Sequence, residues 1–158
     1  MRVEYINPFV ESTFGILSEV LGSEVKRGEI YLKPTTMSIQ GVAALVGLAG
    51  DVEGRVLFDM TKETALFVAG AMNQETFTVL DDLAKATIQE LANMVTAQAV
   101  TKLHDLGFKF DLTPPALFTG DNMEVATNLG EVEALIVPMM FGPDKKIEVN
   151  VAIRERVK

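Results

Sequence analysis

One polar pair stands among small and apolar side chains on a long helical pattern, which runs from Asp81 or Asp82 to Leu106. Glu90 and Asn93 are three residues apart within it. Side chains with this spacing share one helix face, with about 5–6 Å between their Cβ atoms. A carboxamide does not titrate, so Asn93 cannot act as a general base. A single carboxylate without a second one at catalytic distance is a poor glycosidase signature. A carboxamide can, however, hold a water in line for attack on a phosphoryl group, a reaction that depends on alignment and charge neutralisation.

The neighbours of this pair predict a surface on which a partner docks. Ala86 and Ala97 lie on the same face and leave room for close approach, and Met94 flanks them. A solvated helix face usually carries several Lys, Arg and Glu residues at i,i+4 spacing, which this face lacks. A solvated face with chance spacing is the alternative interpretation. The opposite, apolar stripe is expected to face the core; its residues are Ile88, Leu91, Val95, Ala99, Leu103 and Leu106.

Composition excludes several other kinds of site. The 158 residues include no Cys and one His, which excludes disulfides, thiolate nucleophiles and His-rich metal centres. We therefore expect no metal site and no cofactor of the chain's own. The formal net charge of −8 makes a nucleic-acid partner a poor expectation. The N-terminus lacks a secretory pattern and the longest apolar stretch, 41–50, is too short for a bilayer, so we expect a cytoplasmic protein without a membrane segment.

The order of predicted elements indicates an internal repeat within a single domain over residues 1–158. Each half is expected to have one helix followed by three strands, with a short helix at 61–72, capped by Thr61, between the halves. The first half comprises a helix at about 8–21 and strands at 25–32, 39–49 and 52–60; in the second half the long helix precedes strands at 109–118, 131–141 and 146–154. This order predicts an α+β fold with a pseudo-twofold repeat, in which long helices pack on a mainly antiparallel sheet.

Three segments in this layout together resemble the CheC/CheX/FliY family of chemotaxis phosphatases. They are Glu90-Leu-Ala-Asn93 in the long helix, Asp111-Leu-Thr-Pro-Pro115 after it, and the strand pair around 50–54. The resemblance extends from residue 7 to about 151. It implies a phosphatase that hydrolyses the aspartyl phosphate of a CheY-type response regulator, in chemotaxis or two-component signalling. It further implies that Asn93 orients the hydrolytic water, that Glu90 pairs with the regulator's active-site lysine, and that Mg²⁺ is held by the phosphorylated partner.

Two positions depart from the family pattern. The first helix reads Glu11-Ser-Thr-Phe14, with Phe where CheC-like members carry Asn, and Phe14 is expected to turn toward the core. One active helix is therefore expected, which favours a CheX-like member. Ala97 stands where the family often has Gly. The resemblance also implies a homodimer formed through sheet edges.

Other interpretations remain open from the sequence. A non-catalytic module related to flagellar switch proteins would bind the same regulator without needing Asn93, and a scaffold could bind an unrelated partner through the same face. Thr113-Pro114-Pro115 is either a rigid lip beside the site or a device for entering an edge strand. His104, further along the helix face, is assigned no role.

Overall fold

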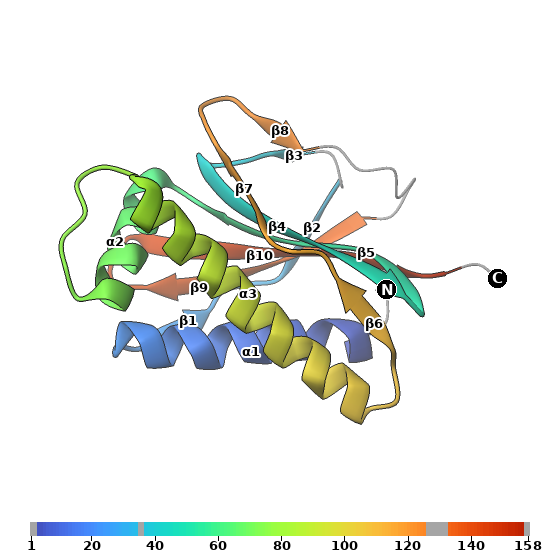
Figure 1. Ribbon diagram of the computed structural model, residues 1–158. Helices are drawn as coiled ribbons and strands as arrows, with labels where there is room; N and C mark the ends of the chain where they lie inside the picture. Colours follow the sequence, from blue (N-terminus) through green and yellow to red (C-terminus); the bar gives the residue numbers. More distant parts are fainter. Residues whose placement is uncertain (1–2, 35–36, 126–132, 157–158) are drawn as a thin grey trace.

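An eight-stranded antiparallel sheet forms the centre of the molecule, and the three helices lie on one of its faces (Figure 1). The computed structural model describes residues 3–34, 37–125 and 133–156. The helices are α1 (Val3–Leu21), α2 (Lys62–Asn73) and α3 (Asp82–Asp105). The sheet contains β1 (Val25–Arg27), β2 (Tyr31–Pro34), β4 (Val42–Gly50), β5 (Val52–Met60), β6 (Phe110–Leu112), β7 (Ala116–Thr119), β9 (Glu133–Phe141) and β10 (Lys145–Glu155). A separate pair joins β3 (Met37–Ser38) to β8 (Glu124–Val125).

The two halves of the chain exchange strands within this sheet. The central order is β9-β10-β5-β4, in which β5 from the first half pairs with β10 from the second. At one edge β1 and β2 both pair with β9, and at the other β6 and β7 both pair with β4. Each half therefore places its first strands against the other half. The expected α+β fold with a repeated helix-and-strand unit is confirmed.

Both faces of the central strands are covered, which explains their nearly continuous apolar sequences. In β4, Val42, Ala44 and Val46 face the helices, whereas Ala43 and Leu45 belong to a smaller cluster on the opposite face. The predicted stripe of α3 is buried from Ile88 to Leu103. Leu106 is the exception, because α3 ends at Asp105 and the chain turns at Gly107 (φ 95°); Leu106 is 61% exposed.

The expected strand at 25–32 is broken where it crosses Pro138. Arg27 pairs with Met139 and Tyr31 with Ile136, so three residues, 28–30, lie opposite two. Pro138 has no backbone N–H to give to this edge, and the ladder keeps only the bond from Gly28 N to the Pro138 carbonyl, 2.8 Å. The result is a bulge that divides the strand into β1 and β2.

The expected strand at 109–118 is broken in the same way at the other edge. Leu112 pairs with Leu48 and Ala116 with Leu45, so Thr113, Pro114 and Pro115 lie opposite two residues. Neither proline can donate to the ladder. We call these three residues the proline bulge; it divides the strand into β6 and β7.

Helix α1 begins at Val3 rather than near Pro8, which lies inside it. The extra turn buries Tyr5, whose ring makes an edge contact with Phe108 at 5.0 Å between centroids. The Tyr5 hydroxyl also donates to Glu155 Oε1 at 3.0 Å. These tertiary contacts override the usual placement of proline at the first helical position.

The remaining boundaries differ by a few residues from those expected. The predicted strand at 39–49 begins at Val42, after Gly41 in a positive-φ conformation. Strand β9 begins at Glu133, and positions 131–132 of the predicted strand lie outside the described residues. Thr61 caps α2 as expected, accepting a hydrogen bond from Thr64 N at 3.2 Å. None of the helices in the described ranges has the length and apolar character needed to cross a membrane.

Candidate functional site

The predicted pair on α3 lies on an exposed face of that helix. Glu90 and Asn93 are both exposed, as are Ala86 and Ala97 before and after them. Met94 is half-buried and packs against the core beneath this face. Val100, further along the helix, is buried because it lies on the side where α3 packs against the rest of the core.

Helix α3 is held firmly, which fixes where its exposed side chains lie. Asp81 caps its N-terminus by accepting a hydrogen bond from Ala84 N at 2.8 Å, which settles the start of the helix that the sequence left between Asp81 and Asp82. Its buried face packs against α1, α2 and β4. Within the helix, Thr96 Oγ1 donates to the Ala92 carbonyl at 2.8 Å. The exposed pair is therefore carried by a rigid element.

A groove of about 540 Å³ lies between α3 and the proline bulge. One side consists of Ala86, Gln89, Glu90 and Asn93, and the other of Leu112 together with the proline bulge. The sequence left two interpretations of Thr113-Pro114-Pro115, and the structure supports both. The three residues interrupt an edge strand, and they also line the groove that contains Glu90 and Asn93.

Three hydrogen bonds hold the proline bulge. Thr113 N donates to the Gly47 carbonyl at 3.0 Å, and Gly47 N donates to Thr113 Oγ1 at 2.7 Å. Gln89 Nε2 donates to the Pro115 carbonyl at 3.1 Å, which joins the bulge to α3. Gln89 is not among the residues predicted from the sequence. A weak signal existed, because consecutive prolines break the ladder and leave nearby carbonyls in need of other donors.

Glu90 is the one charged side chain among the described residues that line the groove. The other lining residues are apolar or carry neutral amide and hydroxyl groups. The surface is therefore suited to a partner that presents one cation among uncharged groups. No cluster of three or more potential metal-ligating residues (His, Cys, Asp or Glu) is found in the described ranges.

The corresponding position in the first helix was predicted wrongly. Phe14 is 42% exposed rather than turned toward the core. The buried face of α1 at this level is formed by Ser12, Thr13 and Ile16, and Thr13 Oγ1 donates to the Phe9 carbonyl at 2.7 Å. Because the Thr13 hydroxyl bonds within the helix, this residue can occupy the core side while the aromatic ring of Phe14 remains outside.

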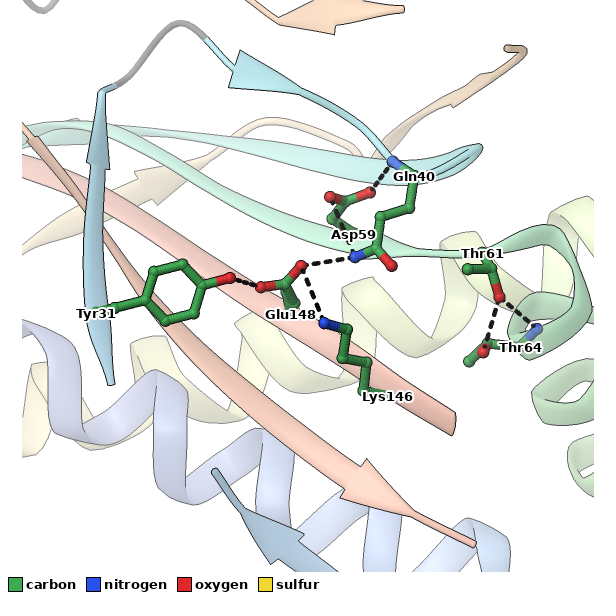
Figure 2. A network of polar contacts seen from close by, with 7 residues as sticks. All are labelled: Tyr31, Gln40, Asp59, Thr61, Thr64, Lys146 and Glu148. Carbon is green, nitrogen blue, oxygen red and sulfur yellow. Dashed lines mark hydrogen bonds and ion pairs between the residues drawn. The ribbon is translucent and has the colours of Figure 1, made fainter. Parts of the chain in front are cut away.

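A second polar cluster, not predicted from the sequence, lies between β5 and β10 (Figure 2). Asp59 and Glu148 are almost fully buried, at 1% and 4% exposed. Gln40 Nε2 donates to Glu148 Oε1 at 2.7 Å, and Gln40 N donates to Asp59 Oδ1 at 2.9 Å. The Tyr31 hydroxyl donates to Glu148 Oε2, and Lys146 Nζ lies 3.9 Å from Oε1. Burial raises the pKa of both carboxyls. An acid between two apolar residues in each strand, Phe58-Asp59-Met60 and Ile147-Glu148-Val149, was the available sequence signal.

Comparison with known proteins identifies the family. The model of the family described as chemotaxis phosphatase CheX matches residues 42–140. The chain belongs to the CheX family. The enzyme class implied by the sequence resemblance agrees with this family, and the matched segment contains α3 with Glu90 and Asn93 as well as the proline bulge.

Relatives of the CheX family match nearly the whole chain. The CheY-P phosphatase CheX of Thermotoga maritima is 32% identical over 156 residues, covering 96% of this chain and 97% of its own. The CheX-CheY-BeF3-Mg²⁺ complex of Borrelia burgdorferi contains a chain 44% identical, with a TM-score of 0.85 over 98% of this chain and 100% of that one. A CheC-like superfamily protein from Shewanella is 26% identical, with a TM-score of 0.86 over 98% and 99% of the two chains.

Proposed function

We propose that this protein hydrolyses the aspartyl phosphate of a CheY-type response regulator, in chemotaxis or another two-component pathway. The observation that carries the proposal is the exposed Glu90 and Asn93 pair, one turn apart on α3 beside a groove with no other charged lining residue. The Thermotoga maritima relative is a CheY-P phosphatase, and the Borrelia burgdorferi relative is a complex with CheY and Mg²⁺. Both support a receiver domain as the partner.

Asn93 acts by positioning in this proposal. Its carboxamide holds a water on the side of the phosphorus opposite the aspartyl oxygen. The water oxygen bonds to phosphorus, the bond from phosphorus to the aspartyl oxygen breaks, and the products are an aspartate carboxylate and inorganic phosphate. The Mg²⁺ that neutralises the developing charge is held by the regulator, so this chain supplies alignment rather than a metal.

Glu90 docks the partner in this proposal. Its carboxylate pairs with the active-site lysine of the regulator. Glu90 is the one charged residue among the described residues that line the groove, so it provides the single negative charge opposite that lysine. Ala86 and Ala97 allow the regulator to approach the helix closely, and Met94 supports the surface from its half-buried position. The regulator's own site and the α3 pair together form the complete catalytic arrangement.

We also propose that residues 1–158 act as one domain, in the cytoplasm, as a homodimer joined through a sheet edge. The support for the first point is the exchange of strands between the halves. The edges available for pairing carry β1 with β2 and β6 with β7. Sedimentation equilibrium tests the dimer, and a monomer at every concentration would contradict it.

The deciding experiment measures phosphate release from a phosphorylated, Mg²⁺-loaded receiver domain with wild type and Asn93→Ala. We expect wild type to accelerate release and Asn93→Ala to lose roughly 100-fold or more of that acceleration, since misplacing the water removes the alignment. Binding to the beryllofluoride-loaded receiver should persist in the variant. Stoichiometric binding without acceleration by wild type would instead support a non-catalytic module related to flagellar switch proteins.

A further inference from the structure

The proline bulge is joined to the catalytic helix through one side chain. Gln89 precedes Glu90 in α3 and lies one turn before Asn93, and its Nε2 donates to the Pro115 carbonyl at 3.1 Å. This bond spans 26 positions in the chain and connects the two sides of the groove. The position of Pro115 relative to the α3 pair therefore depends on Gln89.

The other end of the bulge is fixed against β4. Thr113 exchanges two hydrogen bonds with the backbone of Gly47, at 3.0 Å and 2.7 Å. Gly47 leaves room for this contact, because a Cβ at that position would lie 3.1 Å from Thr113 Cγ2. Pro114 and Pro115 add fixed φ angles. The groove wall is thus rigid before any partner arrives.

The equivalent bulge at the opposite sheet edge is built differently. There the bulged residues are Gly28, Glu29 and Ile30, and the proline, Pro138, lies on the neighbouring strand β9. The structure has two strand breaks of the same register but places consecutive prolines only at the one beside Glu90 and Asn93. A stiff wall is therefore a specific property of the edge that carries the exposed pair.

We propose that Gln89 is a positioning residue that holds Pro114 and Pro115 as a preformed second wall of the docking surface. The proposal rests on the proposed function. The wall receives an uncharged segment of the receiver domain next to its phosphorylated aspartate, because the groove is contiguous with Asn93 and Glu90 is its one charged lining residue. A wall that is ordered beforehand improves affinity, since less conformational freedom is lost when the partner binds.

The test compares two variants with a matched control. Gln89→Met keeps the length of the side chain but removes the donor, and Thr113→Val removes the acceptor for Gly47 N. The control, Gln98→Met, replaces Gln by Met at an exposed position of α3 that does not line the groove. For each protein, steady-state phosphate release gives kcat and KM for the phosphorylated, Mg²⁺-loaded receiver. Hydrogen exchange at the Thr113 amide reports on the bulge without reference to activity.

We expect Gln89→Met and Thr113→Val each to raise KM about fivefold, the equivalent of one hydrogen bond, with kcat within about twofold of wild type. Exchange of the backbone amide at position 113 should accelerate in both variants, and Gln98→Met should match wild type throughout. Equal KM and equal exchange in Gln89→Met and Gln98→Met would overturn the positioning role while leaving the phosphatase intact. A loss confined to kcat would also overturn it. An inactive wild type would contradict the proposed function and this inference together.

Discussion

Asp59 and Glu148 lie directly opposite each other on the adjacent strands β5 and β10, and the side-chain amide of Gln40 reaches both carboxylates. Two acids facing each other inside a sheet are costly to ionise, because burial removes water from both. Gln40 and Tyr31 donate hydrogen bonds to these acids, and Lys146 Nζ, on a side chain that is 46% exposed, lies 3.9 Å from Glu148 Oε1 (Figure 2). The pair therefore makes the stability of the sheet depend on pH.

Glu148→Gln should weaken that pH dependence. Burial raises the pKa of Glu148. In the folded state Glu148 therefore keeps its proton at pH values at which a glutamate in the unfolded chain, with a pKa of about 4, has lost it. This difference makes the free energy of unfolding fall as pH rises through the folded-state pKa. The glutamine side chain in the variant does not titrate, and its carboxamide oxygen can still accept the hydrogen bond from Gln40 Nε2. Urea unfolding from pH 4 to 8 should give a shallower decline than in wild type; Glu19→Gln, at an exposed position of α1, should follow wild type. Parallel curves for Glu148→Gln and wild type would contradict the prediction.

Glu90→Ala should weaken docking more than chemistry. Removing one member of a hydrogen-bonded charge pair costs about 2 kcal/mol or more, so Kd for the beryllofluoride-loaded receiver should rise roughly 30-fold. Turnover at saturating receiver should be largely retained. Titration calorimetry and single-turnover phosphate release measure the two quantities separately. Unchanged affinity would show that Glu90 does not face the partner's lysine.

Ala97→Leu should block close approach of the regulator. The substitution adds bulk to the exposed face of α3 one turn after Asn93, while Leu remains a good helix former. We expect at least a tenfold loss of affinity for the receiver with the melting temperature nearly unchanged, since such a clash affects the complex alone. Gln98→Leu, one position away and exposed on a different side of the helix, is the control. Equal affinities for the two variants would place the docking surface elsewhere.

Phe9→Ala and Phe14→Ala should differ sharply in stability. Phe9 is fully buried at 0% exposed. Replacing a buried Phe by Ala typically lowers the free energy of unfolding by about 3–5 kcal/mol. Phe14 is 42% exposed, so Phe14→Ala should lower the free energy of unfolding much less. Urea denaturation of both variants measures the difference. A large loss in Phe14→Ala would mean that its ring is buried in solution, for example against a second copy of the chain.

The α3 surface could be predicted because a helix repeats every 3.6 residues, so the spacing of Glu90 and Asn93 and the stripe from Ile88 to Leu103 fixed their relative directions. Phe14 could not be placed by side-chain type alone, since Thr13 satisfies its hydroxyl within the helix and occupies the core side.

The breaks that divide β1 from β2 and β6 from β7 could not be predicted from the sequence. Each one depends on a residue of the other half, Pro138 opposite 28–30 and Gly47 opposite the proline bulge. The contact between Gln89 and Pro115 likewise requires a bulge whose register is set by β4. Local patterns describe elements well, whereas contacts between distant segments appear only when the sheet is assembled.

The exchange of strands between the halves has a consequence for folding. Contacts such as that between Tyr31 and Glu148 join residues 117 positions apart, and loops of that length close slowly. A nascent chain that has completed only its first half still lacks β9 and β10, the strands against which β1, β2 and β5 pair. We therefore expect the half without the Glu90 and Asn93 pair to depend on the half that carries this pair during assembly.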